Sequence, residues 1–144
     1  MEKVHIENDW YDGPRKGVAD FDGIPHRFIS NFQDFEDQER CIDTFKLFPI
    51  SVDELNLEIE QWAIFVEWNE KYEAGEVETN SHPGHGGINK RWDELEKILS
   101  NKREAIPEVV FNVTAVFENN NQKNRYEKTG PDYGVIWKLS NENT

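Results

Sequence analysis

The sequence predicts an α+β fold in which an antiparallel sheet of about five strands packs against two helices, in the order β-β-β-α-α-β-β. Strand-like segments open and close the chain, and two segments with helical periodicity lie between them. The length of 144 residues is that of one ordinary domain. No internal repeat, low-complexity tract or linker rich in Pro, Gly or Ser divides the chain. We therefore expect a single domain over residues 1–144.

The first strands are expected in a β-hairpin around Asp22-Gly23, between residues 17–21 and residues 24–29. An Asp-Gly pair favours a type I′ turn, because this turn requires a positive φ at both central residues. Pro25 lacks a backbone N–H, so the hairpin is expected to include an edge strand of the sheet. An acidic loop follows, and residues 42–48 are the third strand candidate.

The long helix is expected to run from about residue 52 to residue 74. Ser51 and Glu54 have the spacing of a capping box, in which each side chain accepts a hydrogen bond from the other residue's backbone N–H. Gly75 suits the residue after the helix, where a positive φ is common.

Two apolar stripes run along this helix, so we expect it to be covered on more than one side. One cover is expected to be the sheet, and the other a second helix, a loop or another subunit. The last alternative would make the second stripe, with Leu57, Ile64 and Trp68, a homo-oligomer interface. The first stripe contains Leu55, Ile59, Trp62, Ala63 and Val66, and the second also contains Phe65 and Tyr72.

The second half of the chain predicts one more helix and two more strands. A loop over residues 75–87 leads to a helix over about residues 89–102, with a single apolar stripe formed by Ile88, Trp92, Leu95 and Leu99. Residues 108–117 alternate, with an apolar face formed by Val109, Phe111, Val113, Ala115 and Phe117. A polar loop with a short strand around Tyr126 and a turn at 129–132 precede the last strand over 133–139.

The charge limits the functions that are plausible. The chain has 29 Asp and Glu against 16 Lys and Arg, a formal net charge of −13. Such a chain repels nucleic acid and anionic membranes and attracts basic partners. Its 18 aromatic residues argue against intrinsic disorder.

Cysteine content and hydropathy bear on the compartment. Cys41 is the only cysteine, which excludes an intramolecular disulfide and a four-cysteine zinc site. The N-terminal residues have no apolar signal core, and the longest apolar run covers only residues 62–66, whereas a membrane-spanning helix needs about 20 residues. We expect a cytoplasmic protein that contacts neither membrane nor nucleic acid.

Two acidic clusters are candidate partner-binding residues. Carboxylates near the C-terminal end of a helix oppose its dipole, at about 0.3–1 kcal/mol per charge, which permits a functional interpretation. The alternative is a solvated helix edge and a solvated loop. The cluster on the long helix comprises Glu60, Glu67 and Glu70, and the cluster in the loop comprises Asp34, Glu36 and Asp37.

An alternative site combines the first hairpin with the histidine loop. Asp12, Arg15 and His26 could supply a general base and an anion clamp, and His82 and His85 resemble a metal-binding pair. The other interpretation is a turn held by Asp12 and a Gly- and Pro-rich connector with exposed histidines. No HExxH, GxxxxGK[ST], GxGxxG or GxSxG pattern is present, so we predict neither a metal nor a cofactor.

Residues 10–14 (WYDGP), 17–20 (GVAD) and 23–26 (GIPH) resemble the start of small uncharacterised bacterial proteins. The resemblance extends over residues 10–50 and implies a bacterial source but no site or activity.

The function predicted first is a non-catalytic acidic domain that binds a basic protein partner, for example as an immunity or inhibitor protein. The alternative is a small enzyme or a ligand- or metal-binding domain with its site between the first hairpin and the His82/His85 loop.

Overall fold

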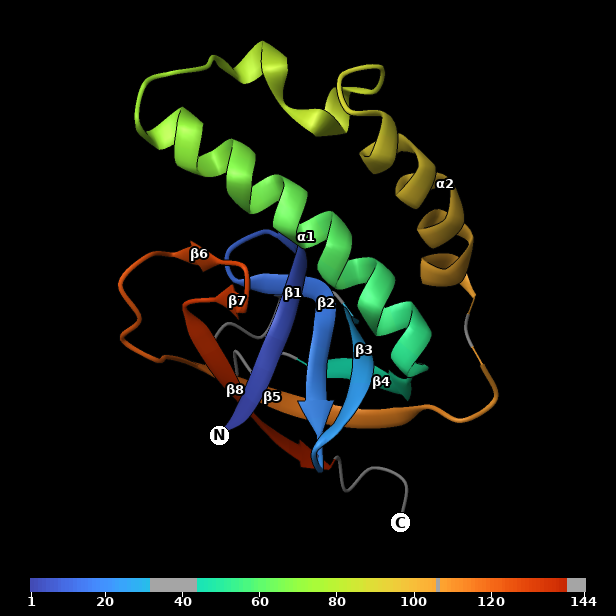
Figure 1. The fold of residues 1–144 in the computed structure, drawn as a ribbon. Coiled ribbons are helices and arrows are strands. Elements are labelled where there is room, and N and C mark those ends of the chain that lie inside the picture. Colours follow the sequence, from blue (N-terminus) through green and yellow to red (C-terminus); the bar gives the residue numbers. More distant parts are fainter. Residues whose placement is uncertain (32–43, 106, 140–144) are drawn as a thin grey trace.

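Six antiparallel strands close into a barrel, and two helices lie on one side of it (Figure 1). This computed structural model describes residues 1–31, 44–105 and 107–139. Around the barrel the strand order is β1-β2-β3-β4-β5-β8. The strands are β1 (Glu2–Trp10), β2 (Pro14–Phe21), β3 (Ile24–Ser30), β4 (Thr44–Pro49), β5 (Phe111–Asn119) and β8 (Tyr133–Leu139).

The helical layer is formed by two long helices and the segment between them. In Figure 1, α1 crosses the barrel beside β1 and β2, and α2 lies along α1. None of the helices in the described ranges is long and apolar enough to cross a bilayer. These elements are α1 (Val52–Glu73), α2 (Lys90–Glu104) and the short 3-10 helices η2 (Thr79–Ser81) and η3 (Pro83–His85); a two-stranded ribbon, β6 (Tyr126–Glu127) and β7 (Gly130–Pro131), lies beside β1.

The predicted α+β class, the two helices and the antiparallel sheet are confirmed. The sheet differs from the prediction because it has six barrel strands instead of about five and closes on itself. The additional strand is β1, in a segment where the sequence analysis predicted none. It closes the barrel through two register pairs with β8, Glu2 with Val135 and Lys3 with Gly134.

The predicted hairpin is present, but the expectation that it includes an edge strand is wrong. Asp22 and Gly23 have φ values of 55° and 75°, as a type I′ turn requires. However, β3 pairs with both β2 and β4. Pro25 is tolerated because it lies at the start of β3, before the register with β4 begins at His26.

The barrel interior is filled with apolar side chains. The predicted apolar face of β5 is confirmed from Phe111 to Phe117, while Val109 precedes the strand and is exposed. Phe28, Phe45 and Trp137 pack with centroids 5.7–5.9 Å apart. The buried interior residues are Val4, Ala19, Phe28, Phe45, Leu47, Val113, Tyr133 and Val135.

A second core lies between the outer surface of the barrel and α1. It contains Ile6, Val18, Trp62 and Val66. Val4 pairs with Ala19 but Ile6 pairs with Val18, so a bulge between Val4 and Ile6 turns Ile6 from the interior to the helix side. The expectation that the sheet covers one side of the long helix is therefore confirmed, at Trp62 and Val66.

The second stripe is covered in part by the same chain. Trp68 donates a hydrogen bond from Nε1 to Ser81 Oγ (2.9 Å) and packs against His82. Leu57 and Ile64 are partly buried, and α2 lies along α1. The homo-oligomer interface expected from this stripe stays a prediction.

The helix ends follow the sequence closely. Ser51 Oγ accepts from the backbone N–H of Glu54 (3.1 Å), and Gly75 has a φ of 75°. The Glu54 carboxylate bonds to Arg27 (2.7 Å), an ion pair that the capping-box pattern does not predict. Asn89 caps α2 by accepting from the backbone N–H of Trp92 (2.8 Å).

Candidate functional site

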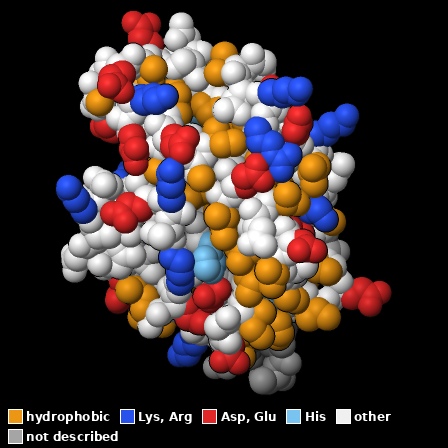
Figure 2. Space-filling model, viewed as in Figure 1, with side chains coloured by type: hydrophobic (Ala, Val, Ile, Leu, Met, Phe, Trp, Pro, Cys, Tyr) orange, Lys and Arg blue, Asp and Glu red, His pale blue; other side chains and the backbone are white. Residues whose placement is uncertain are grey.

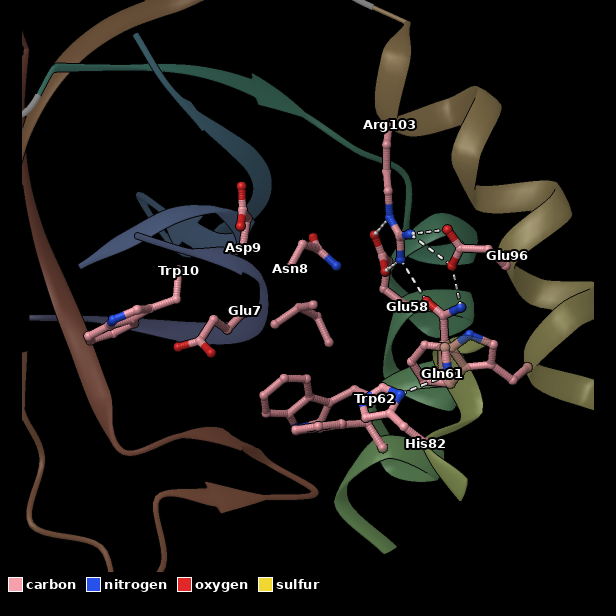
Figure 3. A pocket seen from close by; sticks show the side chains of 14 residues that line it. Glu7, Asn8, Asp9, Trp10, Glu58, Gln61, Trp62, His82, Glu96 and Arg103 are labelled. Carbon is pink, nitrogen blue, oxygen red and sulfur yellow. Dashed lines mark hydrogen bonds and ion pairs between the residues drawn. The ribbon is translucent and has the colours of Figure 1, made fainter. Parts of the chain in front are cut away.

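Two adjoining cavities lie between the barrel and the helical layer, and we call them together the helix–barrel cleft. Figure 3 shows the side chains that line the larger one. The larger has a volume of about 460 Å³ and the smaller of about 330 Å³. They share Asn8, Asp9, Glu96 and Arg103. The larger cavity is also lined by Ile6, Glu7, Trp10, Glu58, Gln61, Trp62, Phe65, His82, Gly84 and Trp92, and the smaller by Lys16, Arg27, Ile29, Ser100 and Glu104.

One wall of the cleft is an irregular stretch of β1. The four consecutive residues from Glu7 to Trp10 all line the larger cavity, whereas a regular strand would turn alternate side chains to opposite faces. The register with β2 shifts between Glu7 and Asp9 and again between Asp9 and Trp10. Such bulges redirect side chains, and they are common beside functional sites.

Gly17 allows β1 and β2 to approach one another at this place. A Cβ on Gly17 would lie 2.1 Å from the carbonyl oxygen of Ile6 and 2.7 Å from the ring of Phe28. Any other residue would therefore have to displace β1 or the interior packing, so a side chain here would disturb the wall of the cleft.

The side chains of Asn8 and Asp9 on this wall are available to a ligand. Both are exposed, and neither side chain forms a hydrogen bond or ion pair with any residue that the structure describes. In Figure 3 the amide of Asn8 points across the cleft toward Glu58 and Arg103. A ligand in the cleft would meet an uncommitted carboxylate and an uncommitted amide.

The opposite wall is held by a buried ionic network. Glu58, which is 1% exposed, bonds to Arg27 of β3 (2.8 Å) and to Arg103 of α2 (2.5 Å). Burial alone would raise the pKa of Glu58, but the hydrogen bonds and charges of the two arginines outweigh burial and hold that pKa below its usual range. Gln61 accepts from Arg103 (2.7 Å) and donates to Glu96 (2.7 Å), so the network joins barrel, α1 and α2.

Glu7 belongs to a different cluster at the floor of the cleft. Its carboxylate accepts from the hydroxyls of Tyr133 (2.7 Å) and Tyr126 (3.3 Å). Burial raises the pKa of Glu7 despite these hydrogen bonds and the nearby charge of Arg125. Burial and the adjacent Glu7 also raise the pKa of Tyr126 to about 12. The guanidinium of Arg125 stacks 4.7 Å from the ring centroid of Trp10 and 5.0 Å from that of Tyr126.

His82 is the one residue of the sequence-predicted alternative site that lines the cleft. Its Nδ1 accepts from the backbone N–H of Gly84 (2.8 Å), and its ring packs 4.5 Å from that of Trp68. Burial and the neighbouring His85 lower the pKa of His82, so the imidazole is neutral at pH 7. His85 bonds through Nε2 to the carbonyl of Thr79 (3.1 Å). The described residues contain no group of three or more His, Cys, Asp or Glu arranged to hold a metal ion.

The structure does not bring the five residues of that alternative site together. Arg15 is 1% exposed and ties the turn between β1 and β2, donating from Nε to Tyr11 O (2.6 Å) and from Nη2 to Asp12 O (3.2 Å). His26 is buried in the barrel against Phe21, and its Nδ1 bonds to the carbonyl of Ile24 (2.7 Å). Neither Asp12, Arg15 nor His26 lines the cleft.

The acidic residues predicted on the long helix are largely committed to intramolecular ion pairs. Glu60 binds Arg91 of α2, with Oε1 2.8 Å from Nη2, and Glu67 binds Lys128 (2.8 Å). These partners lower the pKa of both carboxyls, and Glu70 is exposed. Figure 2 shows acidic and basic side chains interspersed on this face.

Asp34, Glu36 and Asp37 lie outside the residues that the structure describes. The structure therefore does not place the loop cluster relative to the acids of α1.

Sequence reasoning missed the four residues from Glu7 to Trp10 as a unit, because it predicted no strand there. The available signal was the alternation of Val4 and Ile6 with polar residues, followed by three polar residues and a tryptophan. Comparison of the chain with models of protein families, with curated proteins and with solved structures finds no match.

Proposed function

We propose that this chain is a non-catalytic binding domain for a basic protein partner, which it holds at the helix–barrel cleft. The carrying observation is the larger cavity, whose charged lining comprises four carboxylates and one arginine. One of these carboxylates, that of Asp9, has no partner among the described residues. The net charge of −13 adds a long-range attraction for cations.

Aromatic residues beside the cleft support the same proposal. Trp10 lines the larger cavity and is 47% exposed, and the adjacent Tyr11 is 68% exposed. Arg125 stacks on Trp10. Trp, Tyr and Arg are the residue types that most often dominate the binding energy of protein interfaces. Charge would raise the association rate and aromatic burial would slow dissociation, which is the behaviour of an immunity or inhibitor protein.

A second candidate, a small enzyme or ligand-binding domain, is favoured by Glu7. A carboxyl whose pKa is raised by burial and which lines a cavity is typical of acid–base sites. Tyr126 and Tyr133 would orient it. This candidate expects a small molecule in the larger cavity instead of a protein segment.

The test compares two variants that each remove one negative charge. Asp9→Asn changes the cleft, whereas Glu76→Gln changes an exposed carboxylate that lines neither cavity. A partner captured from the lysate of the source organism is identified by mass spectrometry and purified, and its affinity for each variant is measured at low and high salt. We expect a lower affinity at high salt and a loss of about tenfold for Asp9→Asn alone.

Equal affinities of the two variants, or an affinity that does not change with salt, would contradict docking of a basic partner at the cleft. Retention of a small molecule by the wild-type chain, with no protein bound, would favour the second candidate.

A further inference from the structure

The two cavities of the cleft differ in charge. Four carboxylates and one arginine line the larger cavity, whereas the smaller cavity is balanced, with three carboxylates (Asp9, Glu96 and Glu104) and three cations (Lys16, Arg27 and Arg103). Lys16 lies opposite Asp9 in the β1–β2 register, yet no ion pair joins them, and the Lys16 ammonium has no partner among the described residues. The Asp9 carboxylate and the Lys16 ammonium are therefore both unpaired, and they lie on neighbouring strands beside the smaller cavity.

Arg27 provides a second, independent observation. Its side chain is 2% exposed, and its terminal nitrogens bond to Glu54 (2.7 Å) and Glu58 (2.8 Å). Its Nε has no hydrogen-bond partner, and no other buried side-chain nitrogen or oxygen in the described ranges is left in that state. A buried N–H without an acceptor is costly, and Arg27 lines the smaller cavity, so this side chain keeps a hydrogen-bond donor that the described residues leave unsatisfied.

We propose that the cleft recognises a basic amino-acid residue, with its cationic side chain in the larger cavity and its carbonyl or carboxylate oxygen in the smaller one. This inference rests on the proposed function and names the group that is bound. Asp9 receives the cation by charge pairing. Lys16 and Arg27 receive the oxygen.

Two sources can present this chemistry. A free basic amino acid offers a carboxylate to the smaller cavity, and a residue within a partner protein offers a backbone carbonyl. The larger cavity, at about 460 Å³, has the volume of a typical small-ligand pocket and admits either.

The test is a titration of the full ¹⁵N-labelled chain followed by NMR. The probes are L-arginine, N-acetyl-arginine amide, L-citrulline, which has a neutral side chain of similar shape, and butylguanidine, which has the cation without the oxygens. We expect L-arginine or its capped form to shift the amide signals of Asn8, Asp9 and Lys16 and the indole signal of Trp10. Citrulline and butylguanidine should each bind about tenfold more weakly or worse.

Matched variants assign the two subsites. Asp9→Asn should abolish the preference for arginine over citrulline, and Lys16→Gln should abolish the preference for arginine over butylguanidine. Glu76→Gln and Lys123→Gln make the same charge changes at exposed residues outside both cavities and should alter neither preference.

Tighter binding of L-arginine than of its capped form would support a free amino acid, and the reverse order would support a residue of a partner protein. Equal binding of citrulline and arginine at the cleft residues would overturn the inference while leaving the cleft as a binding site. The absence of shifts at the cleft with all four probes would also overturn it. In either case, the affinity of the captured partner for Asp9→Asn would test the proposed function independently.

Discussion

Replacing Glu58 with Gln should destabilise the protein more than any surface charge change. The substitution keeps the size of the side chain but removes the carboxylate that bonds to both Arg27 and Arg103, at a position that is 1% exposed. Removing one partner of a buried ion pair typically costs about 3–5 kcal/mol. Arg27 keeps Glu54, and Arg103 keeps Glu96, so we expect the low end, about 3 kcal/mol.

The assay is urea unfolding at pH 7, monitored by tryptophan fluorescence. The slope of the unfolding free energy against urea concentration should be the same for wild type and variant, so that a shift of the midpoint reports stability. A loss of about 3 kcal/mol corresponds to a melting temperature lower by about 6–12 °C for a domain of this size. Glu60→Gln is the matched control, because it removes an exposed ion pair with Arg91 and should change stability little.

The pH dependence gives an independent check. The pKa of Glu58 is lowered in the folded state. The ionised carboxylate therefore contributes fully to the free energy of unfolding above the ordinary carboxyl pKa, and this contribution is lost as the pH falls through the folded-state pKa. The difference in the free energy of unfolding between wild type and Glu58→Gln should therefore decrease as the pH is lowered. A Glu58→Gln protein as stable as the wild type at pH 7 would refute the assigned role of the network.

Three further predictions follow from the cleft and its supports. The pKa of Glu7 is raised in the folded state, so ionisation of this carboxyl opposes folding. The free energy of unfolding of Glu7→Gln should therefore rise relative to that of the wild type as the pH increases above 4.5, as measured by urea unfolding at a series of pH values. Gly17→Ala should lose about 3 kcal/mol or more in thermal unfolding, because its Cβ would strike the carbonyl of Ile6. Trp10→Ala should change stability little, since Trp10 is half exposed, but should weaken partner binding by at least about tenfold in calorimetry; unchanged binding would remove Trp10 from the interface.

Features that depend on neighbouring residues were predicted correctly. The Asp22-Gly23 turn and the Ser51 cap form in the structure, because turn and cap geometry depends on residues within a few positions. The alternation from Phe111 to Phe117 placed one face of β5 in the core, because successive side chains of a regular strand point to opposite faces.

Features that join distant parts of the chain were missed. The first strand was not predicted, and its pairing of Glu2 with Val135, which closes the barrel, has no local signal. The residues proposed for the alternative site lie apart, because Arg15 bonds within the turn between β1 and β2 and His26 packs in the barrel interior. The sequence alone suggested that Glu60 and Glu67 were unpaired acids on a helix face. In the structure they form ion pairs with Arg91 and Lys128, which lie in other segments of the chain.

The α+β class, the ends of the long helix, the hairpin at Asp22-Gly23 and the excess negative charge follow from the amino-acid sequence alone, because each depends on composition or on short-range periodicity. The cleft, in contrast, depends on how distant segments pack together. Bulges in β1 turn Glu7 through Trp10 into one cavity, and Glu58 on α1 joins Arg27 of the barrel to Arg103 of α2 on the opposite wall. Such a site arises from the packing of α1 against both β1 and α2, and contacts between elements that are separated along the chain are set by the whole fold instead of by any local pattern.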